Sequence, residues 1–335
     1  LDDWRTVMTA FKEQKGATAP LAFTMDQFKS SRIVASAYGV SPWNVCYQEN
    51  GVVKYGPLEP GFKSYLTTLR QWYEEGLLDP DFATLTANTR QAKVLSGEAG
   101  IAHGPTKGAL AAWTTSLRET IPEAEIAGVP YPSLVAGEPV TMGQVNDPVV
   151  PRASISATCA NPAVAMRFLD YGFSEAGHML LNFGVEGVTY TLVDGKPVYT
   201  DFIMGSTEIP PLSLLNRYAT SPEGNGTLPS IYDVGFIEQM NAYMPGINAA
   251  LDAWSASNTF EQNLPSSVLP LAQDSAQYAS VMNEIITYVD EMFCRFIMGQ
   301  ESFDNYDKFV SQVQGKGAAE AVAIMQRAYD NFLSR

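Results

Sequence analysis

The sequence predicts an α/β protein with a helical carboxyl-terminal region. Short β-forming runs alternate with amphipathic helical segments in the first part of the chain, and helical segments dominate the last part. The chain has 335 residues, of which 46% are hydrophobic and 17% charged. That balance is typical of a folded protein with a well-buried core, and the length suits about two domains.

The N-terminal half contains two amphipathic helical segments followed by a strand. Residues 1–11 place acidic side chains in a first turn and apolar side chains on one face. Residues 62–75 repeat large apolar side chains at helical spacing, and Gly76 ends that segment. Residues 99–103 form a β run of small side chains that enters a Gly-Pro turn. A helix-prone segment that contains Trp113 follows this turn.

The C-terminal half begins with two short helices and a hairpin. Asn161 and Pro162 are expected as the cap and first residue of one helix, and Ser174 as the cap of the next, which stops at Gly184. Two β runs within residues 188–199 are joined by an Asp-Gly pair, which is typical of a hairpin turn.

The last third of the chain reads as an irregular segment followed by helices. Residues 203–270 are rich in Pro, Ser, Asn and Gly, and we expect only short helical pieces there. A long amphipathic helix is predicted over residues 281–296, and Gly299 ends it. Two further helices are predicted around residues 306–313 and 318–332.

Charge and cysteine usage exclude several function classes. The net charge of −15 and the lack of a basic run argue against nucleic-acid binding. The three cysteines lie far apart, and only two histidines are present, so no zinc or other metal site is expected. No apolar stretch approaches the ~20 residues of a membrane helix. No signal peptide is recognisable, and the abrupt opening within a helix leads us to expect that a leading part is absent.

Catalytic motifs are equally scarce. Asp79 and Asp81 flank a proline in a turn, where solvated carboxylates are a simpler explanation than a glycosidase pair. His103 follows the small-residue strand and could line a cleft, but no nucleophile elbow accompanies it. The nearby glycines do not form a nucleotide-binding loop. No catalytic residue is therefore expected.

Aromatic side chains outside the regular helix faces suggest a sugar ligand. Sugars stack their C–H faces on Trp and Tyr and bond their hydroxyl groups to planar polar side chains. Trp43 and Asn44 lie in a turn-flanked segment, Trp113 follows the Gly-Pro turn, and Trp254 lies in the irregular region. Each tryptophan can equally belong to the core, because large aromatic residues are usually buried.

Four collinear runs resemble the extracellular solute-binding proteins of carbohydrate ABC transporters. They are VVKYGPLEPGFKSYLTTLRQWYEEGLLDPDF, SGEAGIAHGP, NPAVAMRFLDYGFSEAGHMLLNFGVEGVTY and EIITYVDEMFCRFIMGQESFDNYDKFV. The resemblance covers nearly the whole chain and is greatest to the larger, oligosaccharide-binding members.

The resemblance implies a periplasmic-binding-protein-like class II fold, with two lobes around a cleft and the first lobe incomplete in this chain. Residues 1–200 would form mainly the second α/β lobe with a hinge-proximal helix. Residues 201–335 would form an irregular cleft segment and helices that return toward the first lobe. The missing leading portion would carry most of one lobe and a lipoprotein signal.

The implied function is that of a receptor rather than an enzyme. It would capture a carbohydrate, an oligosaccharide in the larger members, by lobe closure, and deliver it to an ABC importer. Its partners would be the membrane permease subunits, and a lipid anchor would hold it at the cell surface or in the periplasm. No cofactor is implied. The stretch EQKGATAPLAF lacks the acidic ligands of the calcium loop that some larger members carry, so no calcium is expected there.

The resemblance also suggests which residues contact the ligand. His103 would end its strand at the cleft, the following turn would present Thr106 and Lys107, and Trp113 would offer a stacking face. Relatives often carry an aromatic residue directly after this turn, where this chain has Thr106. Glu186 and Tyr190 match a family motif in VEGVTY. Together with Trp43, Asn44 and Trp254, these are the candidate ligand-binding residues.

Two alternatives to a transport receptor remain. A polysaccharide-processing hydrolase or lyase would use an acidic groove and would need a convergent acid–base pair, which the sequence does not place. A surface glycan-binding adhesion module would bind polymer without a permease partner.

Overall fold

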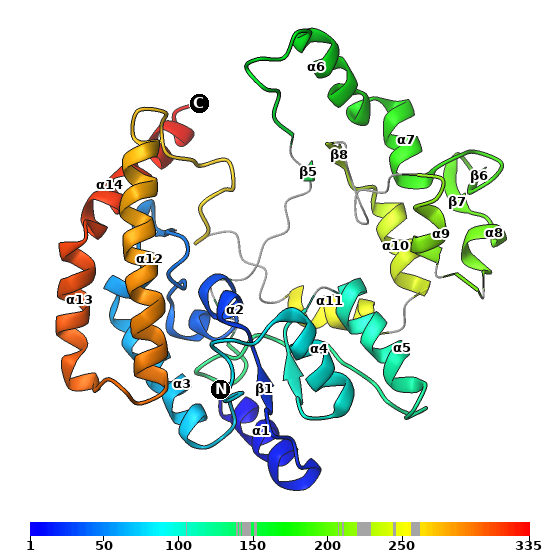
Figure 1. Ribbon diagram of the computed structural model, residues 1–335. Coiled ribbons are helices and arrows are strands. Elements are labelled where there is room, and N and C mark those ends of the chain that lie inside the picture. Colours follow the sequence, from blue (N-terminus) through cyan, green and yellow to red (C-terminus); the bar gives the residue numbers. More distant parts are fainter. Residues whose placement is uncertain are drawn as a thin grey trace. The chain divides into compact units, whose positions relative to one another are not determined.

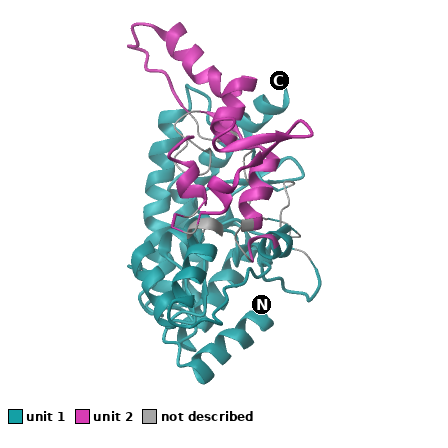
Figure 2. Cartoon of the chain, turned by 90° about the vertical axis from the view of Figure 1, so that its right-hand side faces the viewer, with its two compact units in different colours: residues 1–145, 249–335 teal, residues 146–248 magenta. Residues whose placement is uncertain are grey.

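The chain divides into two compact units in the computed structural model (Figure 2). One unit comprises residues 1–145 and 249–335, and the other comprises residues 146–248. The expected domain boundary after residue 200 falls inside the second unit. The structure describes residues 1–104, 106–138, 140, 142, 149–150, 153–206, 208–209, 211–219, 229–243, 246–255 and 262–335.

The first unit combines short strands with helices from both ends of the chain. Its N-terminal elements are α1 (Asp2–Lys15), β1 (Leu21–Ala22), α2 (Met25–Ser30), η1 (Ala35–Tyr38), β2 (Tyr47–Glu49), β3 (Val52–Lys54), η2 (Gly56–Leu58), α3 (Pro60–Glu74), α4 (Ala87–Ser96), β4 (Ile101–Ala102), the π-helical turn η3 (Thr106–Ala111) and α5 (Ala112–Arg118). Its C-terminal elements are α12 (Ser275–Ile297), η5 (Phe303–Asn305), α13 (Tyr306–Gly315) and α14 (Ala318–Leu333). Helix α11 (Ile247–Ser255) begins at the boundary between the units.

Strands β1 and β4 pair in parallel, with Leu21 opposite Ile101. Leu78 adds a parallel bridge to Leu21. The strand predicted over residues 99–103 is shorter than expected, because the Ala99 N–H bonds to the Lys93 carbonyl at the end of α4 instead of to a neighbouring strand. The carboxyl ends of β1 and β4 therefore lie side by side, which positions the residues that follow them.

An aromatic core holds the first unit together. The indole of Trp43 lies 4.6 Å from the ring of Phe293, centroid to centroid, and Phe62 packs edge-on against it. All three side chains are buried, and burying each contributes roughly 2 kcal/mol from its apolar surface. The helices α3, α12 and α14 that carry or surround this core lie side by side (Figure 1).

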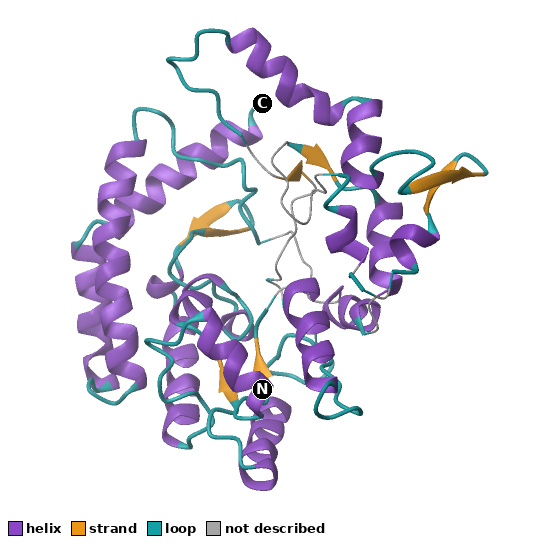
Figure 3. Ribbon diagram, turned by 45° about the vertical axis from the view of Figure 1, so that its right-hand side comes forward, coloured by secondary structure: helices purple, strands orange, loops and turns teal. Residues whose placement is uncertain are grey.

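The helices predicted for residues 62–75 and for the C-terminal region are confirmed. They appear as α3, α12, α13 and α14, and helices outweigh strands throughout the described chain (Figure 3). Gly299 has φ 78° just after α12, and a Cβ there would meet the Arg70 guanidinium at 2.5 Å. Only glycine combines that backbone conformation with that close approach.

The second unit is a smaller assembly of short elements. These are β5 (Val149–Val150), α6 (Pro162–Asp170), η4 (Tyr171–Phe173), α7 (Glu175–Phe183), β6 (Tyr190–Val193), β7 (Lys196–Tyr199), α8 (Asp201–Met204), α9 (Pro211–Leu215), β8 (Ser230–Ile231) and α10 (Val234–Tyr243). The Ser174 hydroxyl accepts the Gly177 N–H at the start of α7, as predicted. The hairpin of β6 and β7 turns at Asp194 and Gly195, which both have positive φ.

Asn182 links the elements of the second unit. Its side chain is fully buried, donates to the Ile231 carbonyl of β8 and accepts the Asp233 N–H. Its own carbonyl accepts the hydroxyl of Tyr199 from β7. A polar residue at this depth is tolerated because its hydrogen-bonding groups have partners.

Helix α6 forms where a helix is predicted, but it lies outside the core of the second unit. Pro162 begins it as expected, but the Asn161 side chain makes no capping bond. Its apolar side chains remain exposed, with Met166 58% and Phe168 63% accessible. None of its residues is buried within the described chain, so its apolar face does not contribute to the core of this unit.

Candidate ligand-binding site

The candidate site is built at the carboxyl ends of β1 and β4. Gln27 lies in α2, which begins shortly after β1, and His103 follows β4 directly. In open α/β sheets, ligands bind in the crevice outside the carboxyl ends of the strands. The paired strands therefore bring two polar side chains, 76 residues apart in sequence, to a position suited to ligand contact.

A capping box fixes the orientation of Gln27. The backbone N–H of Thr24 donates to Gln27 Oε1 at 2.9 Å, so the amide nitrogen of Gln27 points the other way. That nitrogen donates to the His103 carbonyl at 3.1 Å and lies 2.9 Å from His103 Nδ1. Nδ1 must accept this bond, so the proton of the neutral ring sits on Nε2.

His103 is held in its neutral form. Burial is the main cause that lowers its pKa below the ordinary value, and the nearby positive charge of Arg90 lowers the pKa further. Its ring packs edge-on against Phe23, with centroids 6.2 Å apart. The residue therefore presents an N–H donor at neutral pH.

Arg90 and Trp113 form the second half of the site. Arg90 lies in α4 and Trp113 in α5, and the guanidinium carbon is 5.8 Å from the centroid of the indole ring. Both residues are more than nine-tenths buried. Arg90 Nε and Trp113 Nε1 have no hydrogen-bond partner among the described residues. Gly104 packs against the same indole, where an added Cβ would meet Trp113 Cη2 at 3.2 Å.

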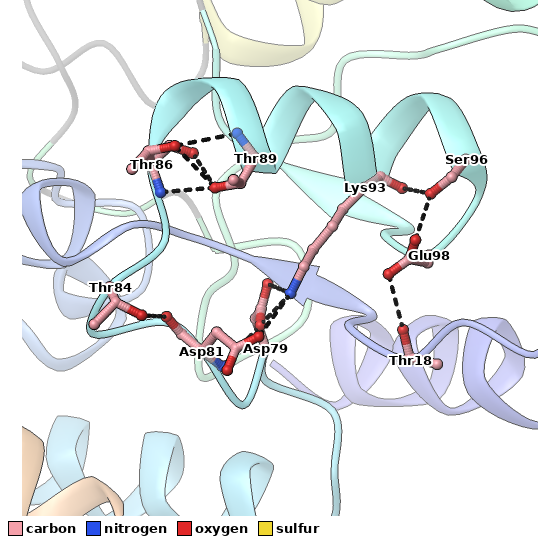
Figure 4. Close-up of polar contacts among 9 residues, drawn as sticks. All are labelled: Thr18, Asp79, Asp81, Thr84, Thr86, Thr89, Lys93, Ser96 and Glu98. Atoms are coloured by element: carbon pink, nitrogen blue, oxygen red, sulfur yellow. Dashed lines mark hydrogen bonds and ion pairs between the residues drawn. The ribbon is translucent and has the colours of Figure 1, made fainter.

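A second cation of α4 serves the fold instead (Figure 4). Lys93 reaches both carboxylate oxygens of Asp79 at 2.8 Å and an oxygen of Asp81 at 3.4 Å. The Asp79 side chain is fully buried, whereas Asp81 is exposed. Asp79 is therefore a buried structural carboxylate whose charge Lys93 compensates, whereas Asp81 is exposed to solvent, as expected from the sequence.

Trp43 and Asn44 are separated from this site by their packing. Trp43 is fully buried in the aromatic core and its indole N–H donates to Asp290 at 2.6 Å. Lys29 pairs with the other oxygen of that carboxylate. Asn44 is exposed, and its backbone N–H bonds to the Lys29 carbonyl. As placed, the indole of Trp43 has no free face for a sugar.

Three other candidates lie nearer the turn or in α11. The backbone of Thr106 and Lys107 belongs to η3, while their side chains lie outside the described residues. Trp254 is partly buried, and its indole N–H donates to the Val129 carbonyl at 2.8 Å. Its ring edge packs over Gly128, where an added Cβ would meet it at 3.0 Å.

Glu186 and Tyr190 belong to the second unit. They form a parallel β-bridge with each other, and Glu186 is exposed. Tyr190 is 6% accessible and packs against Phe183 in the core of that unit. Of the candidates predicted from the sequence, His103 and Trp113 both lie near Arg90, which acts on the charge of His103 and lies over the ring of Trp113.

Gln27 and Arg90 are not among the candidate residues predicted from the sequence. The pattern Thr24-Met25-Asp26-Gln27 is a recognisable capping box, but nothing in it indicates that the glutamine reaches across to His103. Arg90 resembles any helical arginine, and only packing shows that it is buried without a carboxylate partner in the described chain.

Charged groups elsewhere in the first unit satisfy one another. A hollow of about 410 Å³ between α12 and α13 is lined partly by Glu291, Arg295 and Glu301. Arg295 lies 3.3 Å from Glu291 and 3.6 Å from Glu301. The charged side chains that line this hollow therefore pair with one another, whereas Arg90 has no carboxylate partner among the described residues.

The cysteines do not form a reactive site. Cys46 is buried, and burial raises the pKa of its thiol to about 12. Burial also raises the pKa of Cys294, and Cys159 is partly buried. The described cysteines are free thiols, in accord with the structural role expected of buried cysteine.

Solved structures identify the fold class, although no protein-family model and no curated protein matches the sequence. Solute-binding proteins match the chain over nearly its whole length. The chain therefore has a periplasmic-binding-protein-like fold, and the structural neighbours are binding proteins rather than enzymes. This confirms the fold predicted from the sequence.

Three particular structures illustrate the similarity. An alginate-binding protein, determined without calcium ion, matches with a TM-score of 0.71 and 25% identity over 98% of this chain and 68% of that chain. An HMO-binding ABC-transporter-associated solute-binding protein from Bifidobacterium longum infantis has a TM-score of 0.70 and 17% identity. That match covers 99% of this chain and 69% of that chain. A substrate-binding protein of an S. pneumoniae ABC transporter, in complex with kestose, has a TM-score of 0.62 and 15% identity. That match covers 99% of this chain and 68% of that chain.

Proposed function

We propose that this chain is the ligand-binding part of a solute-binding receptor that captures an oligosaccharide and delivers it to an ABC importer. The observation that carries the proposal is the match to the alginate-binding protein, which extends over 98% of this chain at 25% identity. The names of the other neighbours, HMO-binding and kestose-bound, support a carbohydrate as the ligand class.

The geometry of the site supports binding without chemistry. His103, Arg90 and Trp113 supply hydrogen-bond donors that suit sugar oxygens, and Gln27 orients His103. Among the described residues, the neutral imidazole has a glutamine and an arginine as neighbours, and no carboxylate completes an acid–base pair with it. We therefore propose a non-enzymatic role.

The proposal includes a location outside the cytoplasm. The support for this location is a structural neighbour from Bifidobacterium longum subsp. infantis that is named an extracellular solute-binding protein. As a separate finding, none of the described helices is long and apolar enough to cross a membrane. A lipid anchor and permease subunits as partners complete the proposed arrangement at the cell surface or in the periplasm.

A thermal-shift panel tests this function directly. Mono-, di- and oligosaccharides, uronic-acid oligomers, a long glycan polymer and short peptides are added in parallel to the purified protein. A ligand at about one hundred times its Kd adds roughly 2.7 kcal/mol to the free energy of unfolding. We expect one class of oligosaccharide to raise the Tm and to be recovered unchanged by chromatography.

Each other outcome points to a different function. Recovery of cleaved sugar would identify a hydrolase or lyase. A shift with long polymer but with no oligosaccharide would favour an adhesion module. A rise in Tm with peptides alone would contradict the proposed carbohydrate receptor. A panel in which no compound changes the Tm would contradict it as well.

A further inference from the structure

The starting observation is a buried cation that has no counter-charge among the described residues. Arg90 is 7% accessible, and burial lowers the pKa of its guanidinium. Within the described chain no carboxylate pairs with it, whereas Lys93, one turn further along α4, binds Asp79 and Asp81. Burying an ion is unfavourable unless a partner compensates it, so an arginine in this state is unusual for a purely structural residue.

Unpaired donors gather around this cation. Arg90 Nε and Trp113 Nε1 are buried and have no partner among the described residues. His103 Nε2 carries a proton, because Gln27 occupies Nδ1 as a donor. Arginine, the indole N–H and this imidazole tautomer offer donors to a ligand here and no acceptor. Leaving such donors unsatisfied is unfavourable, so the arrangement is complementary to a group that only accepts.

The protein also fixes the orientation of these donors. Arg90 lies over the face of the Trp113 indole, and Gly104 packs against the edge of that ring. Gln27 is held by the capping box and in turn holds His103. A guanidinium positioned in this way can form two parallel hydrogen bonds to a planar carboxylate, which makes recognition both strong and directional.

We infer that Arg90, Trp113 and His103 form a subsite for a carboxylate group of the ligand. Within the proposed function, on which this inference rests, the captured oligosaccharide therefore contains uronic-acid residues. One cation and neutral donors match a singly charged carboxylate that accepts several hydrogen bonds. The ring of Trp113 packs against the guanidinium, and its indole N–H adds a further donor for the carboxylate.

The test compares each acidic ligand with its own neutral counterpart. The probes are a tetramer of galacturonic acid and tetramers prepared from alginate, each with its carboxyl-reduced form, and a sulfated neutral tetrasaccharide. Calorimetry measures the Kd of every probe for the unmodified chain. We expect at least one acidic tetramer to bind about 100-fold more tightly than its reduced form, as is typical when a buried charge pair loses one partner.

Variants of Arg90 assign this difference to the subsite. Arg90→Gln should weaken the acidic tetramer about 100-fold and change the Kd of its reduced form less than threefold, and Arg90→Lys should retain only part of the affinity. Arg167→Gln removes the same charge from an exposed position in the second unit and should leave both values unchanged. If Arg90→Gln does not fold, the comparison of acidic and carboxyl-reduced tetramers on the unmodified chain still shows whether the protein recognises a carboxylate.

The failures of the two proposals are distinguishable. Tight binding of neutral oligosaccharides with equal or weaker binding of the acidic tetramers would leave the receptor function standing and overturn the carboxylate subsite. Binding of the sulfated probe alone would also overturn it, since the group recognised would then be a sulfate ester. An equal loss of acidic and reduced ligands in Arg90→Gln would show that Arg90 supports the fold and not the carboxylate. Binding of no sugar at all would overturn the proposed function itself.

Discussion

At the scale of single residues, hydrogen-bond direction decides what the site can recognise. The Thr24 N–H fixes the Gln27 amide, the amide fixes the tautomer of His103, and the tautomer leaves an N–H as the free group of the ring. Trp43 has no group left for a ligand. Its indole N–H is already bonded to Asp290, and its ring is buried in the aromatic core. The same residue type is thus a ligand-site candidate in one place and a core residue in another.

The lowered pKa of His103 predicts a pH-dependent stability. The unfolded chain takes up a proton on this imidazole near pH 6.5, while burial and the charge of Arg90 oppose protonation in the folded state. The unfolded state therefore binds more protons below pH 6.5, and the free energy of unfolding falls as the pH falls, by at most about 1.4 kcal/mol per pH unit from this residue. Urea denaturation between pH 7 and 5 measures this pH dependence of the free energy of unfolding.

His103→Gln is the matched variant for this measurement. Gln27 from α2 and Arg90 from α4 remain in place beside residue 103, and carboxylates elsewhere titrate equally in both proteins. The difference in free energy of unfolding between the parent protein and His103→Gln should be constant above pH 6.5. Below pH 6.5 it should change in the direction that disfavours the parent protein. A constant difference down to pH 5 would show that His103 titrates as it does in the unfolded chain.

At the scale of elements, α4 carries two cations with different tasks. Lys93 joins α4 to the turn after Leu78 through Asp79, and Arg90 on the same helix faces α5. The Thr86 capping box and the Ser96 and Glu98 contacts hold the two ends of this helix (Figure 4). A rigid helix of this kind supports a site more accurately than a loop does, because its side chains are positioned by the whole element.

Replacing Lys93 should destabilise the first unit strongly. Lys93→Met leaves the Asp79 carboxylate buried without its cation, and we expect a loss of about 3 kcal/mol in the free energy of unfolding. The double variant Asp79→Asn with Lys93→Met should recover most of this loss. Urea denaturation provides the values, and Lys15→Met, on an exposed part of α1, should stay within about 0.5 kcal/mol of the parent. A small effect of Lys93→Met would mean that water reaches Asp79.

At the scale of the whole molecule, net charge and local charge act in opposite directions on an acidic ligand. The chain carries a net charge of −15, while the proposed subsite is centred on one arginine. The overall field repels an anionic oligosaccharide at long range, and the subsite attracts it only at close quarters. Solubility and specificity are therefore supplied by different parts of the same charge distribution.

This opposition predicts an unusual salt dependence of association. Raising the ionic strength from about 10 to 150 mM shortens the Debye length from roughly 30 to 8 Å. The association rate constant of the acidic tetramer should rise about threefold, because repulsion at a distance is screened, and that of a neutral oligosaccharide should not change. Stopped-flow measurement of tryptophan fluorescence provides both rates. A rate that falls with salt would show that the local cation dominates the approach.

The sequence by itself determined the elements and the class of fold. Helical spacing of apolar residues predicted α3 and α12, Asp194-Gly195 predicted the hairpin turn, and collinear motifs predicted the periplasmic-binding-protein-like fold. The helices and the hairpin depend on local periodicity and turn chemistry, which are visible over a few neighbouring residues, whereas the fold was implied by the resemblance of four collinear runs to a known family. His103 and Trp113 were recognisable as candidates because both flank the same Gly-Pro turn.

Only the tertiary structure decided which side chains meet and which remain unpaired. Gln27 reaches His103 across 76 positions because β1 and β4 pair in parallel, and Arg90 reaches Trp113 because α4 packs against α5. Burial and hydrogen-bond satisfaction are properties of such long-range packing, so one helical arginine looks like another in a sequence. The physical reason is that a residue type states what a side chain can donate or accept, whereas the fold alone states whether a partner is there.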